Sequence, residues 1–135
     1  MLRPWVLPAL GATLLAVGCG SESYANRDRP AAPVTVTAAV ENSRVRLSPT
    51  SVGSGPVTFL VANLTDSEQR LTFETAGRGP GIRSSASVSA KGTTQLQVTP
   101  KRGTYQLSVR SGRIEPATLH VGAPRPSAQS ELLQP

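Results

Sequence analysis

One cysteine stands where its sulfur could be chemically modified. Cys19 is the only cysteine among the 135 residues. It ends the sequence Leu15-Ala16-Val17-Gly18-Cys19, whose residue types match a bacterial lipobox. Arg3 precedes an apolar stretch from Trp5 to Val17, so residues 1–18 have the order of parts typical of a signal peptide. We therefore expect cleavage before Cys19 and lipidation of its thiol.

This motif predicts where the protein works. A lipidated Cys19 would anchor the chain to the cell membrane on the extracytoplasmic side, either periplasmic or at the cell surface, with the membrane as its first partner. The apolar stretch is shorter than the roughly 20 residues of a membrane-spanning helix, and Pro8 interrupts it. The alternative is an ordinary secretory signal with an unrelated cysteine, because Ala16 occupies a position where Leu is commoner in lipoboxes.

Cleavage would also change which reactive side chains the mature protein keeps. Met1 and Trp5 leave with the signal peptide, and the mature chain keeps one imidazole, His120, and no free thiol. Internal disulfides are then excluded, so apolar burial and backbone hydrogen bonds must hold the core. About 90 residues remain between the polar ends, enough for a single domain without such cross-links.

The charge of the chain is positive, and the cations are spread along the sequence. Fourteen Lys and Arg against eight Asp and Glu give a net charge of +6, which falls to +5 when Arg3 is removed. No basic stripe with interleaved aromatic residues, typical of nucleic-acid-binding surfaces, is visible. We expect no nucleic-acid partner, and favour solvated strand faces over a basic surface lying on anionic lipid headgroups.

Composition divides the chain into four segments, and no internal repeat is visible. Residues 1–18 form the signal peptide. Residues 19–33, rich in Ser, Ala, Pro and charge, are expected to be a flexible linker from the lipidated cysteine. Residues 34–122 form the folded domain, expected to be a monomer, and residues 123–135 are expected to be a disordered tail.

The folded segment has the pattern of an all-β protein. Short stretches alternate apolar with polar residues, the period of a half-buried strand, and glycine-rich or polar turns separate them. No helical periodicity is present. A more continuous apolar run, 56–62, predicts a central strand covered on both sides. About eight strands are expected, which favours a Greek-key β-sandwich: 34–37, 44–47, 56–62, 71–73, 85–88, 94–98, 104–109 and 117–121.

The order of these stretches resembles the bacterial cupredoxin-like domain, including those of iron-uptake lipoproteins. The resemblance covers most of residues 34–122 and implies a cupredoxin-like sandwich, with an immunoglobulin-like sandwich as the alternative. It is carried by Val45-x-Leu47, Gly55-Pro56-Val57-Thr58-Phe59-Leu60-Val61-Ala62-Asn63-Leu64, Leu71-Thr72-Phe73, Val88-x-x-Lys91-Gly92-Thr93-Thr94-x-Leu96, Gly103-Thr104-Tyr105-Gln106-Leu107 and Ala117-Thr118-Leu119-His120-Val121-Gly122.

The resemblance also implies where copper ligands would stand, and this chain departs from them. A blue-copper centre uses two imidazoles, a thiolate and a weak axial Met. The first family histidine would fall at Gln69, which Arg70 follows, and the cysteine at about Val109. The second histidine and the Met belong to a loop that here is 110–114, with Ile114 near the Met position. This set predicts no type 1 copper site.

Other residues that could do chemistry are better explained without it. His120 is a weak metal candidate, because it has no second imidazole or thiolate beside it, and an exposed structural histidine is favoured. Asp66 and Glu68 resemble a carboxylate pair but suit an ordinary turn. The glycine-rich loop 76–81 lacks the Lys-Ser/Thr ending of a phosphate cradle. Asn63-Leu64-Thr65 matches a glycosylation sequon, which chance or turn formation explains better in a bacterium.

These observations predict a protein that binds or spaces and catalyses nothing. We expect no catalytic residue, no cofactor and no metal, with an envelope protein as a further partner. The alternative is a metal-handling accessory protein, in which His120 with Glu74 or Glu115 binds copper or iron weakly at a site that is not a blue-copper centre. A third interpretation, an immunoglobulin-like adhesion or complex-assembly module, shares the architecture and predicts a protein partner.

Overall fold

The computed structural model describes residues 29–77 and 81–127. The signal peptide, Cys19 and most of the linker therefore lie outside the described residues, as does the end of the tail. The described residues form strands, turns and connecting segments, and none of them lies in a helix. Accordingly, no helix in this part of the chain has the length and apolarity needed to cross a membrane.

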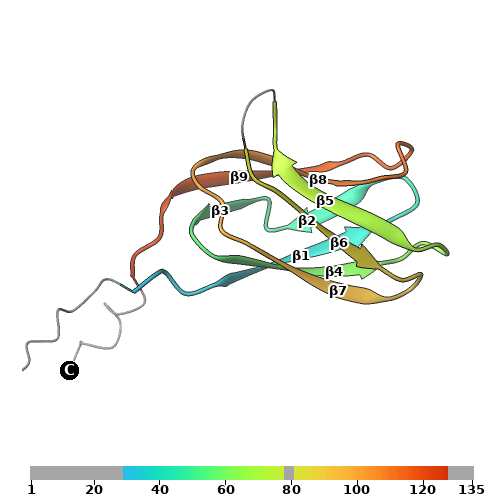
Figure 1. Ribbon diagram of the computed structural model, residues 1–135, viewed down its shortest axis with the longest axis horizontal. Coiled ribbons are helices and arrows are strands. Elements are labelled where there is room, and N and C mark those ends of the chain that lie inside the picture. Colours follow the sequence, from blue (N-terminus) through green and yellow to red (C-terminus); the bar gives the residue numbers. More distant parts are fainter. Residues whose placement is uncertain (1–28, 78–80, 128–135) are drawn as a thin grey trace, which may run out of the picture.

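In the described part of the chain, nine strands form a sandwich of two sheets (Figure 1). The four-stranded sheet has the order β2-β1-β4-β7 and the five-stranded sheet the order β3-β9-β8-β5-β6. The pairs β1–β4 and β3–β9 are parallel, and the other pairs are antiparallel. The strands are β1 Val34–Val40, β2 Val45–Ser48, β3 Ser51–Ser54, β4 Val57–Asn63, β5 Gln69–Thr75, β6 Arg83–Val88, β7 Thr93–Val98, β8 Gly103–Val109 and β9 Ala117–Pro124. The all-β sandwich expected from the sequence is thus confirmed.

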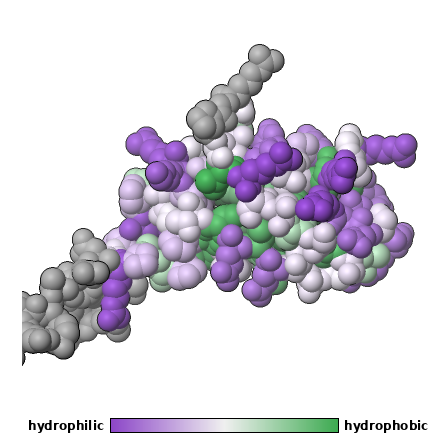
Figure 2. Space-filling model, viewed as in Figure 1, coloured by the Kyte–Doolittle hydropathy of each residue, from purple (hydrophilic) through white to green (hydrophobic). Residues whose placement is uncertain are grey.

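Alternation along the strands supplies the core between the sheets. In β4, Val57, Phe59, Val61 and Asn63 are buried, while the residues between them face outward. Phe59 packs on Phe73 of the opposite sheet with ring centroids 5.1 Å apart, and Phe73 stacks on Tyr105 at 5.0 Å. Hydrophilic side chains surround the hydrophobic residues that show through at the centre of Figure 2.

Two details of the sheets differ from expectation. The prediction that β4 is covered on both sides is wrong, because Leu60 on its outer face is 42% exposed. The apolar run in the sequence is continuous because the outward-facing residues Leu60 and Ala62 are also non-polar. Strand β3 was not expected, since its sequence Ser51-Val52-Gly53-Ser54 has a single apolar side chain. It forms by pairing with β9 at the edge of the sheet.

The two ends of the described chain lie at the same end of the sandwich (Figure 1). Strand β9 continues to Pro124, two residues past the expected boundary at Gly122, because Pro124 pairs with Ser54 of β3. The side chain of Arg125 then donates hydrogen bonds to the carbonyl oxygens of Gly53, Pro56 and Ala32. This clamp joins the segment that enters β1 to the segment that leaves β9.

Candidate functional site

The position implied for the first copper ligand is occupied by an amide that has structural partners. Gln69 begins β5 and is buried. Its Nε2 donates hydrogen bonds to Thr65 Oγ1 at 3.2 Å and to Ser67 Oγ at 2.9 Å. A neutral amide is not the ligand that copper requires at this position of a blue centre. Gln69 therefore holds the turn between β4 and β5.

Asn63 lies at the centre of the same hydrogen-bond cluster. It is 1% exposed, and its Nδ2 lies within hydrogen-bond distance of the carbonyl oxygens of Ser67, Val88 and Ser89 at 2.7, 3.3 and 2.9 Å. Its Oδ1 accepts from the Thr65 backbone N–H at 3.0 Å and from the Thr65 hydroxyl at 2.7 Å. The turn-forming interpretation of this segment is confirmed, and the side chain is enclosed.

Lys91 joins the turn after β4 to the turn between β6 and β7. Its Nζ donates to the carbonyl oxygen of Leu64 at 2.8 Å and lies 3.0 Å from Asp66 Oδ1. The Lys91 backbone has a φ of 55°, a conformation uncommon outside glycine. Asp66 and Glu68 are both exposed on the turn. Asp66 pairs with the cation of Lys91 rather than with Glu68.

The positions implied for the copper thiolate and axial ligand hold packed apolar side chains. Val109 ends β8 and pairs with Leu71, and both Val109 and Ile114 belong to the buried core. An aliphatic side chain offers no electron pair to a metal. The three positions that the resemblance implies for copper ligands therefore hold an amide and two hydrocarbons, a set that does not fit a type 1 copper ion.

His120 stands apart from the carboxylates that the metal-handling alternative would need. It faces outward on β9, opposite Thr104 of β8. Glu115 lies five residues earlier, about 16 Å along an extended chain, beside Arg44. Glu74 is on β5, one strand beyond β8, and forms an ion pair with Arg83. Among residues 29–77 and 81–127, no group of three His, Cys, Asp or Glu is close enough to hold a metal ion.

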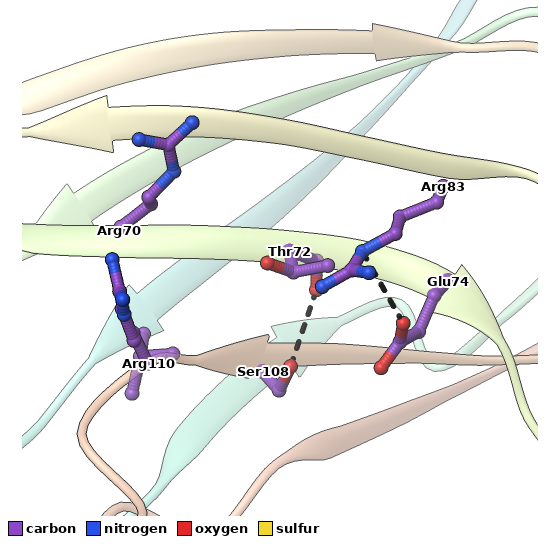
Figure 3. A pocket seen from close by; sticks show the side chains of 7 residues that line it. Arg70, Thr72, Glu74, Arg83, Ser108 and Arg110 are labelled. Atoms are coloured by element: carbon purple, nitrogen blue, oxygen red, sulfur yellow. Dashed lines mark hydrogen bonds and ion pairs between the residues drawn. The ribbon is translucent and has the colours of Figure 1, made fainter.

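A polar groove on the outer face of β5, β6 and β8 was not expected from the sequence (Figure 3). It has a volume of about 330 Å³. Its lining residues are Arg70, Thr72, Glu74, Arg83, Ser108, Val109 and Arg110. In sequence these cations are far apart, but alternate residues of paired strands share one face. The alternation Arg70-x-Thr72-x-Glu74 indicates that these three side chains share one face of a strand. The pairing of this strand with β6 and β8, which completes the groove, cannot be inferred from the sequence.

Glycine-rich loop 76–81 is described only in part, because residues 78–80 lie outside the described residues. Gly77 and Gly81 line a hollow together with Glu74 and Arg83. Gly77 has a φ of 101°, a conformation that glycine adopts without steric cost. Backbone conformation thus explains why glycine occupies position 77 of this loop.

Comparisons with known proteins support the architecture. Neither protein-family profiles nor curated protein sequences match this chain. Among solved structures, it is similar to auracyanin A, described as a "blue" copper protein from Chloroflexus aurantiacus. The identity is 14%, the match covers 67% of this chain and 100% of that chain, and the TM-score is 0.52. Auracyanin B is similar at 15% identity, with 70% and 99% covered and a TM-score of 0.50. The described chain therefore has the cupredoxin-like fold.

Proposed function

We propose that the protein is a membrane-anchored, extracytoplasmic lipoprotein whose metal-free cupredoxin-like domain acts as a binding or structural module and catalyses no reaction. One observation carries the proposal: Gln69, Val109 and Ile114 occupy the positions implied for copper ligands, and none supplies an imidazole, thiolate or thioether. Gln69 is hydrogen bonded to the turn, and Val109 and Ile114 pack in the core. Installing a metal there would require replacing parts of the fold.

The placement of the chain ends supports an anchored arrangement. Arg125 links the entering and leaving segments at one end of the sandwich (Figure 1). From Cys19, the 15 residues of the linker can span at most about 50 Å. A tether of that length lets the domain stand off the membrane while its far end, with the Asn63 cluster, and its flank with the groove face outward.

Copper retention tests the metal-free domain. The purified protein is incubated with Cu(I) or Cu(II), dialysed, and analysed for bound metal and for visible absorption. We expect less than one copper per ten chains and no blue band. Stoichiometric copper that is lost in His120→Ala would instead establish the metal-handling alternative, while a blue band would overturn the assignment of the ligand positions.

Fractionation tests the anchor. The wild-type chain is expected in the membrane fraction and to incorporate radiolabelled palmitate, because an acylated sulfur partitions into lipid. Cys19→Ser removes the acceptor and should release the protein from membranes or leave the precursor uncleaved. A wild-type protein recovered without label, in the soluble fraction and with a free thiol would contradict lipidation and leave an ordinary secretory signal.

A further inference from the structure

We propose that the groove between Arg70, Arg110 and Arg83 binds a tetrahedral oxyanion of the phosphoryl type. The guanidinium groups of Arg70 and Arg110 would hold it, with the hydroxyl groups of Thr72 and Ser108 as further donors. This proposal deepens the binding role proposed above and rests on it.

The backbone forces two like charges together. The Arg110 N–H donates to the Arg70 carbonyl oxygen at 3.1 Å, next to the antiparallel pair Leu71 and Val109. Both side chains project from the outer face at one end of the groove (Figure 3). Like charges opposite each other on neighbouring strands are destabilising. An anion between them would turn this repulsion into attraction.

Neither of these arginines is neutralised by a neighbour in the described part of the chain. The ion pairs there are Arg46 with Glu41, Arg83 with Glu74, and Lys91 with Asp66. Glu68 lines the adjoining hollow with Arg70 and Arg110 but forms no ion pair with either. Glu74 is matched by Arg83 at 3.7 Å, so the groove keeps two uncompensated positive charges.

The floor of the groove offers hydroxyl groups. Ser108 Oγ donates to the Thr72 carbonyl oxygen at 3.5 Å, a long hydrogen bond that a better acceptor can replace. Thr72 and Ser108 lie side by side in the strand pairing, between the Arg70–Arg110 end and the Glu74–Arg83 end. Polar donors thus line the space from one cationic end to the other.

Size and geometry favour a phosphoryl group. A volume of about 330 Å³ compares with about 30 Å³ for a water molecule, so an oxyanion fits with part of its hydration shell. Guanidinium groups present paired N–H donors that match two oxygens of a phosphate, which a single ammonium group does not. A tetrahedral anion has oxygens left for the hydroxyl groups below. A single planar carboxylate has too few oxygens for both guanidinium groups and the floor.

The same chemistry occurs in free phosphate and in the headgroups of anionic phospholipids. Inorganic phosphate is therefore titrated into the ¹⁵N-labelled full chain in non-ionic detergent, at constant ionic strength with chloride as the reference anion. We expect saturable shifts of the Arg70, Thr72 and Ser108 amide resonances, and none with chloride alone. A parallel arm uses the Cys19→Ser variant, which has no acyl chain to hold it on lipid, with phosphatidylglycerol vesicles and phosphate as competitor. Displacement of the protein from vesicles assigns the headgroup as a ligand, and binding of phosphate without vesicle binding assigns a soluble phosphoryl group.

Variants make the test specific. Arg70→Gln and Arg110→Gln should each weaken phosphate binding about tenfold, and Arg70→Lys by less because it keeps the charge but loses the paired donors. Arg102→Gln removes the same charge from an exposed turn outside the groove and should bind as the wild type does. All three positions are exposed, and thermal unfolding checks that each of the four variants folds. Equal weakening by Arg102→Gln, or shifts scattered over all exposed arginines, would overturn the proposal. The phosphate titration and the copper-retention experiment are independent measurements, so the phosphoryl site and the metal-free function can each be contradicted without the other.

Discussion

Asn63 and Thr65 are joined by two hydrogen bonds to one oxygen: Asn63 Oδ1 accepts from the Thr65 N–H at 3.0 Å and from its hydroxyl at 2.7 Å. The opposite end of the same amide reaches the turn between β6 and β7 through the carbonyl oxygens of Val88 and Ser89. One buried side chain thus ties together two turns that are more than twenty residues apart.

Replacing Asn63 should therefore destabilise the whole domain. Asn63→Ala leaves Thr65 and the carbonyl group of Val88 buried without their partner and removes the bond to the part-buried carbonyl group of Ser89, at a cost of about 2–4 kcal/mol in the free energy of unfolding. Urea denaturation measures it. Leu64→Ala, at the exposed neighbouring residue, is the matched control and should change stability by less than about 0.5 kcal/mol. Equal effects of the two variants would show that the cluster contributes nothing.

Much of the fold was predictable because it depends on local alternation. The period-2 pattern in 34–37 and 104–109 identified strands β1 and β8, since each buries every second residue. Strand β3 escaped because an edge strand of Ser and Gly has no such pattern and exists only through its pairing with β9. The groove escaped for a related reason: Arg70 and Arg110 meet through antiparallel pairing, and sequence distance carries no trace of it.

The contact between the two sheets gives a second prediction. Phe73 packs on Phe59 and Tyr105 and is completely buried. Phe73→Ala should lower the free energy of unfolding by about 3–5 kcal/mol, through lost burial and the cavity that remains. Leu60→Ala truncates an apolar side chain on the outward face of β4 and should cost less than about 1 kcal/mol. Guanidinium denaturation compares the two, and a similar loss for both would contradict the assignment of inner and outer faces.

The hydrogen bonds of Arg125 at the chain ends give a third prediction. Arg125 donates to the carbonyl oxygens of Gly53, Pro56 and Ala32, so Arg125→Gln should lose most of these bonds and cost about 1–2 kcal/mol. The effect should be local, because β3 is an edge strand held largely by β9. Hydrogen exchange followed by NMR should show faster exchange in Ser51–Ser54, with β4 unchanged. Uniform acceleration over both sheets would argue that Arg125 stabilises the domain globally instead.

Alanine variants of three glycines distinguish the cost of an unfavourable backbone conformation from the cost of steric crowding around the added Cβ. Gly55 has a φ of 130°, and a Cβ there would lie 2.9 Å from Arg125 Nη2. Gly77 has a φ of 101°, and no atom of the described residues lies within 4 Å of the position its Cβ would take. Gly77→Ala should therefore cost only the conformational strain, about 1–2 kcal/mol, and Gly55→Ala should cost more because the clamp must also shift. Gly112 has neither a positive φ nor a close neighbour, so Gly112→Ala should be neutral or stabilise by about 0.4–1 kcal/mol through the unfolded chain. Thermal and urea unfolding of the three variants gives the order of stability. If Gly77→Ala were as damaging as Gly55→Ala, the strain would account for both and the contact with Arg125 would carry no cost.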